Sequence, residues 1–285
     1  MHGKVNLIEC PRDAMQGWKD FIPTTKKIEY INALLAIGFD TLDMGSFVSP
    51  KAVPQMADTK EVIGQLSRGN STSKLLVIVA NLRGAEEAVA FDEISYLGFP
   101  FSISPTFQLR NTNSTIEQSI VAVEKIQELS IKNKKELVVY ISMGFGNPYG
   151  DIYNPEIVIK WVEELVKVEI KIISLADTVG VAQPTEIFSI LNNVIPKYQD
   201  IEFGVHLHST QQGRQEKIDA ALQAGCKRFD GALKGIGGCP FANDELVGNI
   251  DTAWLISYLK EKKMPLHINE EALQKALVLA DKIFM

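Results

Sequence analysis

Two histidines separated by one residue, His206 and His208, are the side chains in this sequence whose type and spacing most directly indicate chemistry. Alternate residues of a strand point to the same side, so both imidazoles would face one point. With a carboxylate such as Asp13, they make a plausible site for a divalent cation that leaves open positions for a substrate. The segment has no cysteine, which favours Mg²⁺ or Mn²⁺ over a closed structural Zn²⁺ site.

An ordinary structural role must be weighed for each of these residues. A single histidine on a strand is more often a core residue than a ligand. A pair at the end of one expected strand favours ligation instead. Asp13, in contrast, could simply cap a helix or a loop.

Four more polar residues follow or end expected strands, and we regard them as catalytic candidates together with His206: Arg12, Asp43, Asp177 and Cys239. Asp177 opens a turn and could equally be a cap. Cys239 follows two glycines and precedes a proline, which places its thiol on a constrained turn where it could give or recover a proton. The other two cysteines, Cys10 and Cys226, are expected to be inert core residues.

The elements that must position these residues alternate along the whole chain, with no Pro/Gly/Ser-rich linker between them. We expect strands at 5–10, 41–45, 74–80, 96–102, 136–143, 171–176, 202–208 and 228–233. We expect helices at 24–38, 58–68, 85–90, 113–133, 154–168, 185–194, 213–224 and 245–262, with an additional C-terminal helix at 269–285.

Eight strand–helix units predict an α/β fold, a single (β/α)8 TIM barrel over residues 1–285. Its active site would lie at the carboxyl ends of the strands. An open doubly wound sheet is the alternative. It is disfavoured because no G-x-G-x-x-G follows the first strand and no Walker A motif occurs.

Composition narrows the class of protein. The chain has 285 residues, 46% of them hydrophobic, and a net charge of −6 with its 29 Lys and Arg residues scattered. A large core is therefore possible, and no nucleic-acid partner is expected. Apolar stretches are far shorter than the roughly 20 residues that span a bilayer, so no membrane partner is expected. No presequence is evident at the N-terminus, and we expect a cytoplasmic protein with reduced thiols.

Five segments carry a resemblance to a known family: IECPRDAMQ, GSFVSPKAVPQMAD, LADTVGVA, VHLHST and GIGGCPFANDELVGN. In order and spacing they resemble the 3-hydroxy-3-methylglutaryl-CoA (HMG-CoA) lyases, a group of barrel metallolyases. The resemblance covers nearly the whole chain. SFVSPKAVPQM and GIGGCP are its most specific pieces.

The resemblance implies a reaction and a set of roles. The protein would cleave HMG-CoA, an acyl-CoA, to acetoacetate and acetyl-CoA, and would act as a homodimer. Asp13, His206, His208 and Asn249 would ligate the cation, while Arg12 would lie against the reacting carbonyl and Cys239 would transfer a proton. His206 would also accept or relay the hydroxyl proton. Only the resemblance assigns Asn249, which unaided would be interpreted as a helix cap.

The chain departs from the family pattern at several positions. Asp43 stands where the lyases have a longer acidic residue, Ser209 replaces an aspartate, and Met143 and Asn147 occupy positions where many lyases have cysteine. One residue is missing before Pro11, and the segment 239–249 is one residue longer than in the animal enzymes. Two alternatives therefore stay open. One is a related aldolase or Claisen-type barrel acting on another 3-hydroxyacyl-CoA or a 2-oxo acid, and the other is a barrel that only binds acyl-CoA.

Overall fold

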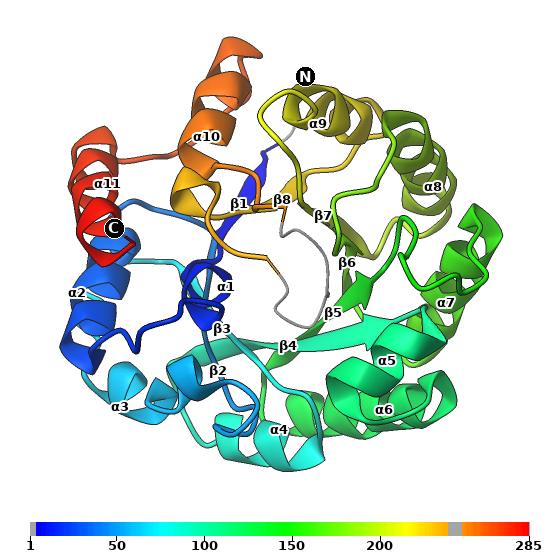
Figure 1. Ribbon diagram of the computed structural model, residues 1–285, viewed down its shortest axis with the longest axis horizontal. Helices are drawn as coiled ribbons and strands as arrows, with labels where there is room; N and C mark the ends of the chain where they lie inside the picture. Colours follow the sequence, from blue (N-terminus) through cyan, green and yellow to red (C-terminus); the bar gives the residue numbers. More distant parts are fainter. Residues whose placement is uncertain (1–3, 239–246, 285) are drawn as a thin grey trace.

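A computed structural model describes residues 4–238 and 247–284, in which eight parallel strands form a closed barrel surrounded by helices (Figure 1). Each strand pairs with the next along the chain, and β1 pairs with β8 to close the ring. The predicted TIM barrel is therefore confirmed, and the open sheet is excluded. The strands are β1 (Asn6–Glu9), β2 (Thr41–Ser46), β3 (Lys74–Ile78), β4 (Ile94–Ser102), β5 (Glu136–Ser142), β6 (Ile172–Asp177), β7 (Glu202–Leu207) and β8 (Arg228–Gly231).

The helices follow the strands, and most begin at a residue that satisfies the first free backbone N–H groups or at a proline, which lacks one. They are α1 (Pro11–Gln16), α2 (Thr24–Leu35), α3 (Thr59–Gly64), α4 (Leu82–Ala88), α5 (Pro105–Thr112), α6 (Ile116–Lys132), α7 (Pro155–Lys167), α8 (Pro184–Lys197), α9 (Arg214–Gln223), α10 (Thr252–Glu261) and α11 (Glu270–Ile283). Two short 3₁₀ turns are η1 (Pro54–Met56) and η2 (Leu233–Gly235).

Capping residues shift two helix starts from their expected positions. The helix expected at 113–133 starts only at α6, because Thr115 forms a capping box with Gln118. A separate helix, α5, precedes it and was not predicted. The helix expected at 245–262 is α10, which starts after its cap Asp251. Asn249 thus precedes this helix instead of opening it.

Apolar side chains fill both the space between the barrel and its helices and the barrel interior. The larger core lies between strands and helices. A smaller cluster inside the barrel consists of Leu76, Ile78, Val138, Tyr140 and Ile172. Charged and polar side chains at the carboxyl end of the strands lie above this cluster, where the predicted site residues gather.

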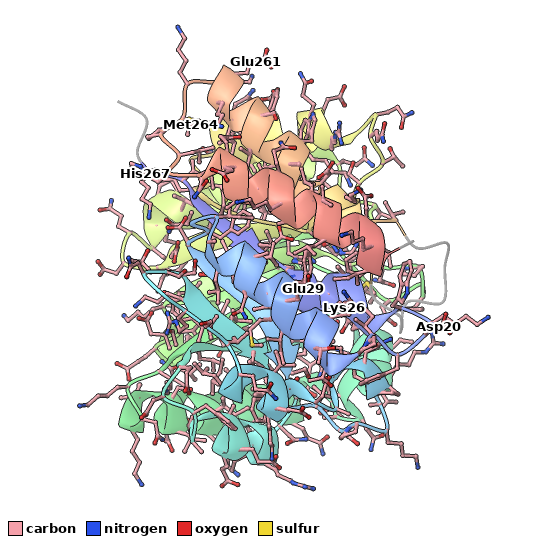
Figure 2. The ribbon with its side chains drawn as sticks, turned by 90° about the vertical axis from the view of Figure 1, so that its left-hand side faces the viewer. Asp20, Lys26, Glu29, Glu261, Met264 and His267 are labelled. Atoms are coloured by element: carbon pink, nitrogen blue, oxygen red, sulfur yellow. The ribbon has the colours of Figure 1, made fainter. Side chains whose placement is uncertain are left out.

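The C-terminal helix α11 lies beside α2 on the outside of the barrel (Figure 2). The backbone N–H of Asn269 donates to the carbonyl of Ile37 at 2.8 Å. At the other end of α11, the ring of Phe284 packs edge-on against Trp18 and Tyr30. This helix therefore covers the first strand–helix unit. It is the additional C-terminal helix that the sequence predicts. No helix in the described ranges is both long and apolar enough to cross a membrane.

Candidate metal centre and active site

Three predicted ligands meet at the carboxyl end of the barrel. Potential ligand atoms of Asp13, His206 and His208 all lie within 4.8 Å of one another, and all three residues are buried. His206 belongs to β7 and His208 follows it, so both face inward as the H-x-H spacing predicts. Asp13 comes from α1, which Pro11 starts directly after β1. Figure 1 shows this short helix inside the outer ring of helices.

Hydrogen bonds set the orientation of the two imidazoles. Nδ1 of His206 lies 3.1 Å from Oδ2 of Asp230, and Nδ1 of His208 lies 2.6 Å from the carbonyl oxygen of Val247. Both partners are acceptors, so a neutral ring in either position carries its proton on Nδ1 and has its lone pair on Nε2. A ring fixed in this way is typical of metal-ligating histidines.

Asn249 lies beside these three residues. Its Nδ2 donates to Oδ2 of Asp13 at 2.7 Å and to the carbonyl of Ile236 at 2.9 Å, and its backbone forms a bridge with His208. The structure thus brings together all four residues to which the resemblance gives a ligand role. One carboxylate, two imidazoles and one amide are a donor set that suits a divalent cation.

The guanidinium of Arg12 contacts two carboxylates, those of Asp43 and of the ligand candidate Asp13. Its Nε donates to Oδ1 of Asp43 at 3.1 Å, its Nη2 pairs with Oδ2 of Asp43, and its Nη1 donates to Oδ1 of Asp13 at 2.9 Å. Asp43 is 1% exposed and does not line the cavity, so it holds the guanidinium from behind. Gln16 donates to Asp13 at 2.8 Å and lines the cavity; the sequence did not single it out.

Burial and neighbouring charges shift the pKa values of this cluster in different directions. Burial alone would raise the pKa of Asp13, but Arg12 and the two histidines outweigh it and lower that pKa to about 2. Burial raises the pKa of Asp43 even though Arg12 opposes it. Burial and the neighbouring His206 lower the pKa of His208. At neutral pH Asp13 is therefore ionised and His208 is neutral, as ligation requires.

Asp177 occupies a supporting position next to the ligands. Its Oδ1 accepts from the backbone N–H of Ala182 at 3.0 Å, and its Oδ2 accepts from Nζ of Lys217 at 2.6 Å. Lys217 also donates to the backbone carbonyls of Gly180 and His208. Asp177 does not line the cavity, whereas the hydroxyl-bearing Thr178 does. Its predicted catalytic role stays a prediction, and Lys217 is a partner that the sequence did not indicate.

A cavity of about 230 Å³ opens over the cluster. Its polar lining includes Arg12, Asp13, His206 and His208, and also Arg110 and Asn111. Apolar lining comes from Val48, Val53, Ile78, Pro100 and Phe107. Such a mixture can hold a ligand with both a charged and an apolar part.

Three other residues that the sequence singled out are Met143, Asn147 and Cys239. Met143 is buried and adopts a positive φ of 57°. The Asn147 side chain binds the backbone of residues 149 and 151 and so shapes its own loop. Cys239 lies outside the described residues.

A buried acidic and imidazole cluster at the mouth of a (β/α)8 barrel defines a class of candidate metal-dependent barrel enzymes. Comparison with known proteins narrows that class. The HMGL-like family matches residues 5–279. The chain therefore belongs to the HMGL-like family, and it is a lyase.

Individual relatives agree with the family. The chain is 35% identical over 258 residues to the cytoplasmic 3-hydroxy-3-methylglutaryl-CoA lyase of Rattus norvegicus, covering 90% of this chain and 74% of that protein. It is 31% identical over 273 residues to (R)-citramalyl-CoA lyase of Chloroflexus aurantiacus, covering 93% and 86%. An HMG-CoA lyase from Acinetobacter baumannii, solved with coenzyme A and 3-methylmalate, superimposes with a TM-score of 0.88 at 33% identity, covering 96% of this chain and 89% of that chain.

Proposed function

We propose that this protein cleaves HMG-CoA to acetoacetate and acetyl-CoA. The convergence of Asp13, His206 and His208 carries the proposal, because these three residues, which line the cavity, could together hold a divalent cation. Family membership and similarity to the rat lyase support this substrate. The coenzyme A complex of the Acinetobacter relative supports an acyl-CoA ligand.

Asp13, His206, His208 and Asn249 would hold Mg²⁺ or Mn²⁺. When bound, such a cation supplies Lewis-acid polarisation of the substrate oxygens. Asp13 and the two imidazoles can ligate as they are oriented, but the amide of Asn249 must turn its oxygen toward the ion, because its nitrogen now faces Asp13. Nε2 of His206 is the one nitrogen of that ring free either to ligate or to accept a proton, and we assign it to ligation.

Arg12 and Cys239 would act on the substrate itself. Breaking the carbon–carbon bond moves negative charge onto the thioester oxygen, and the guanidinium of Arg12 would stabilise that enolate more than the ground state. Asp43 would keep the guanidinium in position through two contacts. Cys239 would then donate a proton to the enolate carbon. Its thiolate would recover the proton that the substrate hydroxyl releases to water when its carbon becomes the carbonyl of acetoacetate.

The (R)-citramalyl-CoA lyase relative favours a second candidate, a lyase for another 3-hydroxyacyl-CoA. We also propose a cytoplasmic homodimer. The name of the rat relative supports the location, and the family resemblance supports the dimer.

The decisive experiment incubates the purified protein and Mn²⁺ or Mg²⁺ with HMG-CoA and, separately, with citramalyl-CoA. Acetoacetate and acetyl-CoA should appear from HMG-CoA, with a kcat/KM at least tenfold above that for citramalyl-CoA, and chelation should stop the reaction reversibly. A preference for citramalyl-CoA would establish the second candidate. Full turnover after the metal is stripped would contradict the proposed cation site.

A further inference from the structure

Three polar residues and a glycine continue the site downward into the barrel. Strand pairing places Tyr140 of β5, Ser174 of β6, Gly204 of β7 and Arg228 of β8 in one row of neighbours. The next row toward the site contains His206 and, paired with it, Asp230. Arg228 and Asp230 are two residues apart on β8, so both side chains face inward. The row therefore lies directly below the residue that orients His206.

Arg228 is unusual in this position. It is 2% exposed, and within the described ranges its Nε and Nη2 have no hydrogen-bond partner. Its Nη1 lies 3.5 Å from the carboxylate of Glu202, near the opposite end of the barrel. Gly204 makes space for it, since a Cβ there would lie 2.8 Å from Cδ of Arg228. β7 thus contains a glycine, a residue that is unfavourable in strands, at the point where the side chain of Arg228 packs against it.

Three other buried polar atoms, on strands β5, β6 and β8, also lack a hydrogen-bond partner within the described ranges. They are the hydroxyls of Tyr140 and Ser174 and Oδ1 of Asp230. Leaving a buried polar group unsatisfied costs about 1–3 kcal/mol, so atoms that gather in this way indicate a bound group between them.

The chemistry of these atoms identifies the group. Arg228 offers only donors and Oδ1 of Asp230 only accepts, while the two hydroxyls do both. An anion would leave the carboxylate oxygen unmatched, and a cation would leave the guanidinium unmatched. Water satisfies both, and buried water commonly makes about three such bonds.

Electrostatics also links the two charged residues. Burial lowers the pKa of Arg228, but Asp230 first, and then Tyr140 and Glu202, raise it above its ordinary value. Asp230 is therefore a counter-charge of the buried guanidinium in addition to Glu202, although no direct hydrogen bond joins Asp230 to Arg228.

We infer that Arg228 is a positioning residue of the metal centre: through ordered water held by Tyr140 and Ser174, it fixes the carboxylate of Asp230, which orients His206. This inference rests on the proposed ligand role of His206. Tyr140 supports the same ring directly, because its own ring packs edge-on against His206 with centroids 6.1 Å apart. The interior of the barrel thus holds the imidazole from below.

The test measures Mn²⁺ affinity by calorimetry in the folded, substrate-free protein. Partners that orient metal ligands typically contribute 10–100-fold to metal affinity. Asp230→Asn and Arg228→Met should each weaken Mn²⁺ binding at least tenfold. If Arg228 acts through Asp230, the double variant should bind Mn²⁺ no more weakly than Asp230→Asn alone.

Lys135→Met is the matched control. Nζ of Lys135 is also a buried cation, bound to the carbonyls of Phe91, Asp92 and Ile94 at the other end of the barrel. This variant should lower Tm and keep Mn²⁺ affinity. Cys10→Ala should also keep it; a loss would indicate instead a second cation site in which Cys10 joins His206 and Asp230.

Tyr140→Phe keeps the shape of the ring and removes only its hydroxyl. This variant replaces Arg228→Met in the test if Arg228→Met does not fold. It should weaken Mn²⁺ binding several-fold. The inference is wrong if Arg228→Met, or Tyr140→Phe in its place, lowers Tm but binds Mn²⁺ within twofold of the wild type, or if the two single effects add. Failure of the wild type to bind Mn²⁺ would instead overturn the proposed metal site and this inference with it.

Discussion

At the residue scale, the guanidinium of Arg12 is held by two carboxylates before any substrate arrives. Its pairing with Asp43 uses two nitrogens and so fixes the plane of the guanidinium as well as its position. A rigid planar donor needs little reorganisation when enolate charge develops. The shorter acidic residue at position 43 thus reaches Arg12 directly.

We predict that Arg12→Gln lowers kcat by about two to three orders of magnitude, the usual cost of removing one oxyanion donor. Arg12→Lys should lose less, but still far more in kcat than in KM, because a point charge does not reproduce the planar fork. Steady-state kinetics with HMG-CoA measures both. Arg83→Gln is the control, since that side chain is 87% exposed on α4. An unchanged kcat in Arg12→Gln would remove Arg12 from the mechanism.

Cys239 can be tested because the other two thiols are inaccessible. Cys10 and Cys226 are buried, and burial raises the pKa of Cys226 to about 12. An alkylating reagent should therefore label Cys239 first and abolish turnover, and substrate should protect against it. Cys239→Ser should reduce turnover and leave Mn²⁺ affinity unchanged. Wild-type activity in this variant, measured by acetoacetate release, would show that the thiol of Cys239 takes no part in proton transfer.

Sequence reasoning found the residues whose spacing within one segment carries information, such as His206 and His208. It could not find Asp230 or Lys217, because their importance arises from strand register and from the packing of α9. Asn249 required the family resemblance, since an asparagine before a helix is usually a cap.

At the scale of elements, Glu9 links three of them beneath the site. It is fully buried at the end of β1, where Oε1 accepts from the N–H of Leu233 at 2.8 Å and Oε2 accepts from the hydroxyl of Thr252 at 2.6 Å. These partners belong to η2 and to the first turn of α10. Glu9 thereby joins the first strand to the segments on both sides of residues 239–246.

Burial raises the pKa of Glu9 to about 8 from an ordinary value of 4.5. The folded protein then binds one more proton than the unfolded chain between these pH values. Its contribution to stability is complete below pH 4.5 and is lost as pH rises through about 8, by at most about 1.4 kcal/mol per pH unit.

Glu9→Gln should remove this dependence, because the amide can keep both hydrogen bonds without titrating. We predict a Tm that equals or exceeds that of the wild type at pH 8, and a flatter profile of Tm between pH 5 and pH 8 by calorimetry. Glu86→Gln, on the exposed face of α4, should follow the wild-type profile. A wild-type slope retained in Glu9→Gln would show that another group titrates.

The alternation of strands and helices was predictable because most barrel strands are largely buried runs and most outer helices have an apolar face. The short helices α1 and α5 were not predicted. With 6 and 8 residues, they are too short to show helical periodicity, and Pro11 and Pro105 rather than hydrophobic spacing mark where they begin.

At the scale of the whole molecule, the proposed cation site depends on barrel closure. Asp13 follows the first strand, whereas the two histidines end the seventh, so the unfolded chain has no comparable site. A ligand that binds only the folded state stabilises it by about 2.7 kcal/mol at one hundred times its Kd.

We predict that Mn²⁺ added at this excess to EDTA-treated protein raises Tm by roughly 4–5 °C. Scanning calorimetry provides the measurement. His208→Ala should fold with a lower metal-free Tm, because it loses a buried hydrogen bond, and Mn²⁺ should shift that Tm little. An equal shift in His208→Ala would mean that the ion binds elsewhere.

The pairing of β1 with β8, and the contact of Asn249 with Asp13 across 236 positions, also affect the order of folding. Contacts between distant parts of a chain pay a large loop-closure entropy and tend to form late. During synthesis, the chain cannot assemble the four proposed ligands until residue 249 has left the ribosome. A nascent chain that ends between Gly231 and Asn249 would have all eight strands but lack one proposed ligand, so full cation affinity would appear only after the ring can close.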